Sequence, residues 1–338
     1  MHKRIGLMAL VWGLVGCTPP SPVSPNQWES VQTLYQDVFL LREKVMYRSG
    51  GLKIFGQICR PNRAGQFPIV VWNHGGFEGL QVGDANLCQN LAFLGYVVLM
   101  SSYRGEDGSE GRIEVCQGEV DDVLQMLAIG RTMPYANPNR VAVAGGSHGG
   151  CISLRAVQKG APAQVLIDLF GPTDWISEYQ QLEQLATSGD SNQKRASQTL
   201  IPLLQTALGG TPAQTPQSYR VRSPIEYAAS LSNWPGSMLV VHGALDWLVL
   251  PGQSCNLVKA VGGFTSFRIS ANNTTSTTAP AGCEAAGLSW AGGEVPRGNW
   301  GGKRYLLVYD NFGHGDGEQG NLALLDVLNY LGNKFPAN

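Results

Sequence analysis

The pentapeptide Gly145-Gly-Ser-His-Gly149 is the feature of this sequence that most restricts its fold. It follows the run Arg140-Val-Ala-Val-Ala144 and precedes a stretch compatible with a helix. Glycines on both sides of Ser147 suit a sharp, strained turn between a strand and a helix, because the backbone there approaches its neighbours closely. A G-x-S-x-G match is weak evidence in a chain with 43 glycines. The prediction of a nucleophilic serine therefore depends on partners elsewhere in the chain.

Two candidate partners follow in the order acid, then histidine. Asp246 comes shortly after the buried-strand pattern Ser237–His242, and His314 comes after the pattern Tyr305–Tyr309. The carboxyl ends of parallel strands converge in one crevice, so we expect both residues to meet Ser147 there. His314 would then remove the serine proton and later pass it to the leaving group. Asp246 would fix the imidazole tautomer and stabilise the imidazolium.

Asp168 is an alternative for the acid, because it ends the strand pattern Gln164–Asp168. We favour Asp246, since it lies in the strand–loop unit that precedes the unit of the histidine. Of the five histidines in the chain, only His314 has the right place in both order and topology. A loop-capping carboxylate remains the simpler interpretation of either aspartate.

Gly76 and His148 are the candidate donors of an oxyanion hole. The apolar strand pattern Phe67–Asn73 breaks at His74-Gly-Gly-Phe77, where paired glycines would let a backbone N–H approach the site. We expect the Gly76 amide there, opposite the amide of His148 at the start of the following helix. We expect His74 to shape this loop. A simple glycine turn is the alternative for the stretch.

The rest of the chain alternates between strand and helix patterns, which predicts a mostly parallel sheet covered by helices on both faces. Two segments interrupt the alternation. Residues 175–230 carry leucine-rich, helix-like runs and predict a small cap over the active site rather than a disordered linker. Residues 266–300 are rich in Gly, Ala, Ser and Thr and predict a long surface loop. The regular elements are expected as a hairpin over 43–48 and 52–59, strands at 69–73, 97–101 and 141–145, and helices near 86–94 and 119–129.

Seven motifs together carry a resemblance to a known family. They are His74-Gly-Gly-Phe77, Ser102-Tyr-Arg-Gly-Glu-Asp-Gly-Ser109, Gly145-Gly-Ser-His-Gly149, Gly171-Pro-Thr-Asp174, Ser223-Pro-Ile225, His242-Gly-Ala-Leu-Asp246 and Gly313-His-Gly315. The set resembles the catalytic domain of the prolyl oligopeptidase family and its dienelactone-hydrolase-like relatives, over roughly residues 43–335. The resemblance implies an α/β-hydrolase fold, a Ser147–Asp246–His314 triad and acyl-enzyme chemistry on a peptide or an ester.

Three features depart from that family. The chain before residue 43 is too short for the β-propeller that restricts access in the larger oligopeptidases, and His74 stands where they have an oxyanion tyrosine. Asp246 and His314 are also 68 residues apart, more than the family pattern usually allows. A more open site favours esters, or a mixed esterase and peptidase range. A strict serine-type oligopeptidase and a non-catalytic surface lipoprotein are the alternatives.

The N-terminus is typical of an export signal. A basic start precedes the apolar run Ile5–Val15, which is too short to span a bilayer. Leu14-Val-Gly-Cys17 resembles the bacterial lipobox, in which the cysteine is acylated and becomes the first residue; an ordinary secretory signal is the alternative. We expect a signal peptide at 1–16, a proline-rich tether at 17–28 lipidated on Cys17, and a hydrolase domain at 29–338. An aspartate after that cysteine would be a retention signal for the inner membrane. Thr18 follows it instead, which favours the outer membrane or periplasm of a bacterium.

Six cysteines remain after Cys17, an even number that suits an exported chain with up to three disulfides. Fifteen connectivities are possible, and we favour Cys255–Cys283, which would staple the unusual insertion to the helix after Asp246. Reduced, buried cysteines are the alternative, above all for Cys59 and Cys151. The other two are Cys88 and Cys116.

Charge and composition exclude several other functions. A net charge of −1 gives no electrostatic footprint for nucleic acid, and no Cys/His spacing suggests zinc. Gly315-Asp-Gly-Glu-Gln-Gly320 matches a dinucleotide loop superficially, but only a terminal helix follows it. The acidic group Glu119, Asp121 and Asp122 is expected to complement a helix dipole rather than bind a metal. We expect no cofactor. The partners would be a small ester or short peptide substrate and, through the lipid, a membrane.

Overall fold

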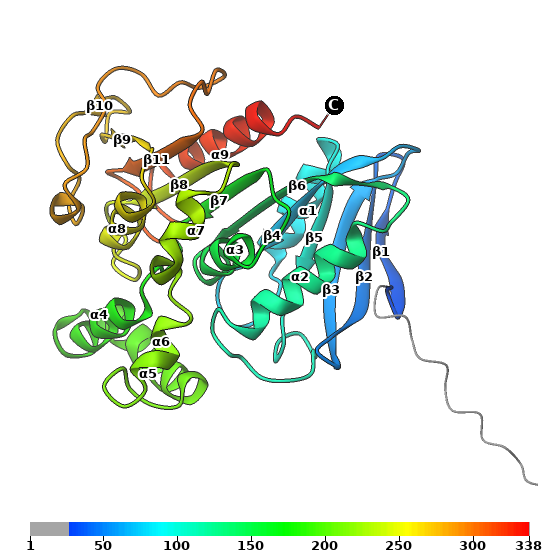
Figure 1. Cartoon of the computed structure of the whole chain (residues 1–338), viewed down its shortest axis with the longest axis horizontal. Coiled ribbons are helices and arrows are strands. Elements are labelled where there is room, and N and C mark those ends of the chain that lie inside the picture. The colour runs from blue at the N-terminus through cyan, green and yellow to red at the C-terminus, as the bar shows by residue number, and fades with distance from the viewer. Residues whose placement is uncertain (1–26, 338) are drawn as a thin grey trace, which may run out of the picture.

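A computed structural model describes residues 27–337 and centres on an 11-stranded sheet (Figure 1). Its strand order is β1-β2-β3-β5-β4-β6-β7-β8-β11-β9-β10. The strands from β5 to β9 along this order are parallel, while β1, β2, β3 and β10 pair antiparallel with their neighbours. The strands are β1 (Ser30–Gln36), β2 (Leu40–Ser49), β3 (Leu52–Pro61), β4 (Phe67–Asn73), β5 (Val97–Ser101), β6 (Ala136–Gly146), β7 (Val165–Leu169), β8 (Ser237–Gly243), β9 (Thr265–Ile269), β10 (Thr275–Ser276) and β11 (Arg304–Tyr309).

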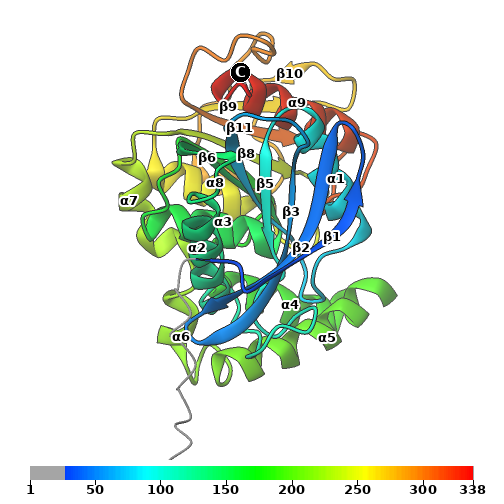
Figure 2. The same cartoon turned by 90° about the vertical axis from the view of Figure 1, so that its right-hand side faces the viewer.

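Helices cover both faces of the parallel strands, as the sequence predicts. Alternate residues of one strand enter separate cores: Val71 belongs to the cluster under one set of helices, and Val70 to the cluster under the other. The first set comprises α2 (Gly118–Gly130), α3 (His148–Gln158) and α8 (Pro251–Val261). The second comprises α1 (Val82–Phe93) and α9 (Gly320–Lys334), and Figure 2 shows the sheet between the two sets. Because both faces are covered, β5 and β7 are buried at every residue. This is the α/β-hydrolase fold.

The predicted hairpin over residues 43–59 forms as β2 and β3, which extend it to 40–61. Gly50 and Gly51 make its turn with φ of 56° and 87°, a backbone conformation that favours glycine. An additional strand that was not predicted, β1, pairs with β2 at the edge of the sheet. Every residue of β1 is exposed, so no burial pattern marks it in the sequence.

Residues 175–232 form helices rather than a linker: α4 (Trp175–Ser188), α5 (Ser191–Leu208), α6 (Pro216–Arg220), a 3₁₀ turn (Pro224–Tyr227) and α7 (Ala228–Ser232). Polar caps explain where α4 and α5 begin, since Asp174 and Asp190 each accept hydrogen bonds from two backbone N–H groups of the first turn. Gly209, with a φ of 85°, ends α5. In Figure 1, α4, α5 and α6 lie together at one end of the molecule, whereas α7 lies beside α8 (Pro251–Val261).

The expectation of a surface loop over 266–300 is wrong for its first residues. Ser266 to Ile269 belong to β9, which pairs with β11 inside the sheet and buries Phe267 and Ile269. The average composition of the long segment hid this short alternating strand. Further along, Trp300 is 1% exposed, so the irregular part of the segment also contributes to the core.

All six cysteines after Cys17 are paired, as Cys59–Cys88, Cys116–Cys151 and Cys255–Cys283. The favoured pair is therefore present, and the reduced alternative for Cys59 and Cys151 is wrong. Three disulfides indicate a protein that folds outside the cytoplasm. No helix within 27–337 is long and apolar enough to cross a membrane. The predicted signal peptide, Cys17 and most of the predicted tether lie outside the described residues.

Candidate active site

Ser147 occupies the turn between β6 and α3, with a φ of 53° and a ψ of −127°. A non-glycine residue adopts this conformation only when its surroundings impose it. The neighbours show how tight the turn is. A Cβ on Gly149 would lie 2.0 Å from the carbonyl oxygen of Asn73, and one on Gly145 would lie 2.4 Å from the carbonyl oxygen of Gly149. The glycines of the motif are therefore required by close backbone approach.

The structure brings Ser147, His314 and Asp246 together in one hydrogen-bonded series. Ser147 Oγ lies 2.8 Å from His314 Nε2, and His314 Nδ1 lies 2.8 Å from Asp246 Oδ2. The three residues come from the turn after β6 and the loops after β11 and β8, which are all at the carboxyl end of the sheet. In the neutral imidazole, Nδ1–H donates to the carboxylate, which leaves Nε2 free to accept the serine proton.

The carboxylate of Asp246 is held by more than the catalytic histidine. Its Oδ1 accepts the backbone N–H groups of Leu248 and Val249, at 3.0 and 2.9 Å. Burial acts to raise the pKa of this carboxyl, but hydrogen bonds from His242 and His314 outweigh burial and lower the pKa to about 2. Asp246 is therefore an anion throughout the neutral range.

His242 is a neighbour of the acid that the sequence analysis left without a role. Its Nε2 lies 3.3 Å from Asp246 Oδ2 and 2.8 Å from the carbonyl oxygen of Val249, and its Nδ1 lies 2.7 Å from Ser254 Oγ. The side chain is fully buried. Only the four-residue spacing between His242 and Asp246 could have signalled this contact.

Asp168, the alternative acid, has a different environment at the end of β7. It is fully buried, and its Oδ1 accepts the N–H of Gly171 at 3.2 Å. Burial raises the pKa of this carboxyl to about 7. Across residues 27–337, no hydrogen bond joins Asp168 to His314, so this aspartate does not replace Asp246 in the series.

Gly76 and His148, the two candidate oxyanion donors, are tied together by the His148 side chain. The backbone N–H of Cys116 donates to His148 Nε2 at 2.9 Å, so the ring proton lies on Nδ1, which donates to the carbonyl oxygen of Gly76 at 3.2 Å. Burial, together with the nearby His74, lowers the pKa of His148 to about 3 and keeps the ring neutral. Only the backbone amide of His148 was predicted to take part in the site; no signal in the sequence indicated the bridge made by its side chain.

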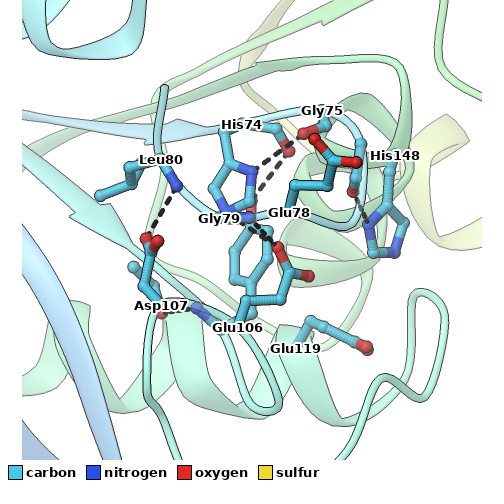
Figure 3. Close-up of polar contacts among 12 residues, drawn as sticks. His74, Gly75, Glu78, Gly79, Leu80, Glu106, Asp107, Glu119 and His148 are labelled. Carbon is cyan, nitrogen blue, oxygen red and sulfur yellow. Dashed lines mark hydrogen bonds and ion pairs between the residues drawn. The ribbon is translucent and has the colours of Figure 1, made fainter. Parts of the chain in front are cut away.

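Two carboxyls of the 102–109 motif support the other end of the same loop (Figure 3). Glu106 Oε2 accepts the N–H of Gly79 at 2.6 Å, and Asp107 Oδ2 accepts the N–H of Leu80 at 2.8 Å. His74 begins the loop, stacks on the ring of Tyr103 at 4.1 Å between ring centres, and lies 3.9 Å from Glu106 Oε2. His74 thus shapes the loop, as expected.

Glu106 is strongly perturbed in this position. Its side chain is 3% exposed, and burial raises its pKa to about 8, with the negative charges of Glu119, Asp107 and Glu78 adding to the shift. The N–H of Gly79 opposes the shift but is outweighed. The carboxyl that supports the loop is therefore largely protonated at neutral pH.

The acidic group at the start of α2 does not act only on the helix dipole. Glu119 is buried and accepts the backbone N–H groups of Glu114, Val115 and Gln117. The expectation is wrong for Asp122, whose two oxygens bind the guanidinium of Arg104 at 2.8 and 3.0 Å. The reason is that Asp122 turns toward the 102–109 motif rather than toward the helix end.

A pocket opens beside Ser147, between the 74–80 loop and the helices of the 175–232 segment. Its cavity volume is about 100 Å³. Most of the side chains that line it are apolar; besides Ser147 and His148 of the site itself, the polar one is Glu178 of α4. Its lining residues are Gly76, Phe77, Ser147, His148, Pro172, Trp175, Glu178, Leu182, Leu200, Leu204, Leu248 and Val249.

This fold, with an aligned serine, histidine and aspartate at the carboxyl end of its sheet, defines a serine hydrolase of the α/β-hydrolase class. Residues 85–262, more than half of the chain, match the model of the prolyl oligopeptidase family. The chain belongs to the prolyl oligopeptidase family.

Individual relatives include both peptidases and esterases. The chain is 24% identical over 203 residues to the uncharacterized peptidase YtmA of Bacillus subtilis (strain 168), which covers 60% of this chain and 72% of that protein. Among solved structures it is similar to the acylaminoacyl peptidase of Pyrococcus horikoshii, with a TM-score of 0.62 and 15% identity over 89% of this chain and 42% of that one. It thus spans about two fifths of that peptidase. Acetyl xylan esterase 1 from Thermoanaerobacterium sp. JW/SL YS485 gives a TM-score of 0.58 and 15% identity, over 89% of this chain and 87% of the esterase.

Proposed function

We propose that this protein is an envelope-anchored enzyme that cleaves ester or peptide bonds through an acyl-enzyme formed on Ser147. The observation that carries the proposal is the series of two 2.8 Å hydrogen bonds from Ser147 to His314 and from His314 to Asp246. A non-catalytic surface protein would gain nothing from keeping a strained serine in line with this histidine.

In the first half of the proposed reaction, His314 Nε2 takes the Ser147 proton as Oγ attacks the substrate carbonyl carbon. The carbonyl oxygen becomes negative and is stabilised by the backbone N–H groups of Gly76 and His148. His314 then gives its proton to the leaving alcohol or amine, and the acyl group stays on Ser147. In the second half, water loses a proton to His314, attacks the acyl carbon and releases the acid and Ser147.

Asp246 supports both halves through its fixed negative charge. Its hydrogen bond holds the His314 ring in the tautomer that presents Nε2 to the serine, and its charge stabilises the imidazolium. The two backbone N–H groups on its Oδ1 fix the carboxylate plane, so a neutral replacement is expected to lose charge and orientation together.

The choice between esters and peptides rests on access to the site. The acetyl xylan esterase is matched over 87% of its own length, and its fold follows that of this chain over almost the whole enzyme. The acylaminoacyl peptidase is matched over 42% of its length. We therefore propose ester cleavage or a mixed range. Strict peptidase activity is the second candidate, favoured by the family match and the YtmA relative.

The proposed location outside the cytoplasm is supported by the three disulfides. The finer proposal of a membrane anchor rests on Leu14-Val-Gly-Cys17 and the proline-rich tether after it. Lipidation of Cys17 would hold the hydrolase domain at a membrane surface.

A substrate panel tests the proposed activity. Short-chain p-nitrophenyl esters are compared with aminoacyl and prolyl p-nitroanilides, and Ser147→Ala serves as the control. We expect ester turnover that disappears in the variant. Turnover of nitroanilides alone would establish the peptidase candidate, and unchanged turnover in Ser147→Ala would remove Ser147 from the mechanism.

A further inference from the structure

Glu178 is the one carboxyl in the wall of a mostly apolar pocket. It lies one turn into α4, lines the pocket beside Ser147, and its side chain is 3% exposed. The neighbouring walls are Trp175 and three leucines of α4 and α5, namely Leu182, Leu200 and Leu204. Because burying a charged group without a partner is strongly unfavourable, a carboxyl at this position needs an explanation.

The protein fixes this carboxyl but does not neutralise it. Gln253 Oε1 accepts the N–H groups of Thr173 and Asp174, at 2.7 and 2.8 Å, which orients the amide. Its Nε2 therefore points the other way and donates to Glu178 Oε2 at 2.8 Å. Within residues 27–337, no ion pair to Glu178 is present. A single neutral donor holds the carboxyl in place without balancing a negative charge.

The electrostatic surroundings favour a positive ligand group. No lysine or arginine lines the pocket, and His148, the one histidine in its lining, is neutral because burial lowers its pKa to about 3. Asp246 adds a second negative charge close enough to raise the pKa of Glu178, although burial is the larger cause of that increase. An incoming cation would therefore meet the carboxyl of Glu178, the pocket leucines and the indole of Trp175, which can also attract it. Glu178 would release its proton to solvent as the cation pairs with it.

We propose that this pocket selects an acyl group whose side chain ends in an ammonium or guanidinium, with Glu178 as its counter-ion. The inference rests on the proposed function. The acyl side of the substrate is assigned because the pocket is lined by both candidate oxyanion donors, Gly76 and His148, and not by His314, which would protonate the leaving group. The aliphatic stem would pack on the leucines, as long cationic side chains do, while the charged end reaches the carboxyl.

Two matched substrates test this proposal: the thiobenzyl esters of N-acetyl-lysine and N-acetyl-norleucine, which share a four-carbon stem and differ in the amine. We expect wild type to prefer lysine in kcat/KM by at least about tenfold, as expected where a buried polar group is left unpaired by the wrong substrate. Glu178→Gln, which keeps the hydrogen bond from Gln253, should remove this preference and bring the ratio of kcat/KM for the two substrates to about one. Glu183→Gln, which removes an exposed carboxylate from the same helix, is the matched control and should keep it.

An equal or inverted preference in wild type would overturn the proposal, and so would an unchanged ratio in Glu178→Gln. A binding measurement on wild type alone covers the case in which the variant fails to fold. Butylammonium, but not butanol, should protect Ser147 from a fluorophosphonate probe, and equal protection by the two would also overturn the proposal. Absence of any Ser147 labelling would instead contradict the proposed function, so the two failures are distinguishable.

Discussion

Glu106 supports the 74–80 loop, and the pKa of its carboxyl is raised to about 8. The free energy of unfolding should therefore depend on pH through the protonation of this side chain. The folded-state pKa lies above the unfolded value of 4.5, so the protonated carboxyl favours the folded state. Its contribution is fully present below pH 4.5 and is lost as the pH rises through 8. At 1.36 kcal/mol per pKa unit, an isolated group with this shift contributes about 5 kcal/mol.

Part of that titration lies below pH 5, so it does not contribute to the change between pH 5 and pH 9. We therefore expect Glu106 to account for a loss of about 2–4 kcal/mol in the free energy of unfolding between pH 5 and pH 9. This is a large part of the 5–15 kcal/mol that is usual for a folded domain.

Glu106→Gln removes the titration and keeps an oxygen that can accept the Gly79 N–H. Urea unfolding of wild type and variant at pH 5, 7 and 9 measures the difference directly. Between pH 5 and pH 9, the free energy of unfolding should fall by about 2–4 kcal/mol more in wild type than in Glu106→Gln. Glu183→Gln, which changes an exposed carboxylate, should show the same fall as wild type. Parallel curves for wild type and Glu106→Gln would refute the reasoning, because Glu106 would then titrate alike in both states.

Two further predictions concern the acid and the anchor. Asp246→Asn should lower turnover by roughly several thousand-fold with the fold intact, because a neutral amide cannot stabilise the imidazolium of His314. Asp168→Asn should lower turnover far less. Measuring kcat of both variants on one ester substrate checks this, and the opposite ranking would assign the role of the acid to Asp168. If Cys17 is acylated, the mature chain should begin at Cys17 and sediment with membranes, and Cys17→Ala should release the enzyme or leave its precursor unprocessed. Fractionation with N-terminal mass analysis decides this, and a soluble mature protein that starts after Cys17 would contradict it.

The three residues of the hydrogen-bonded series could be predicted because their positions depend on the order of the strands and not on the details of tertiary packing. Ser147, Asp246 and His314 each follow a strand pattern, and parallel strands deliver such positions to one edge of the sheet. The aligned 2.8 Å hydrogen bonds are then a consequence of topology. For the same reason, the doubly covered sheet could be predicted from the alternation of its elements.

The supporting contacts could not be predicted, because they join segments that are distant in sequence. The ring of His148 bridges Cys116 and Gly76, which are 32 and 72 residues away from it. Glu106 looks like a surface loop residue in Arg-Gly-Glu-Asp-Gly and becomes buried only when the 74–80 loop packs over it. The strand β9 was missed for a different reason: five strand residues begin a long Gly- and Thr-rich segment whose average composition indicates a loop.

The central claim is that Ser147 is a nucleophile activated by His314, and covalent labelling tests it most directly. The mature protein is treated with a fluorophosphonate probe, and the modified peptide is located by mass spectrometry. We expect a single adduct on Ser147, none in Ser147→Ala, and labelling that is strongly slowed in His314→Ala because the serine proton then has no acceptor. Folded wild-type protein that resists the probe, or an adduct on another residue, would contradict the account.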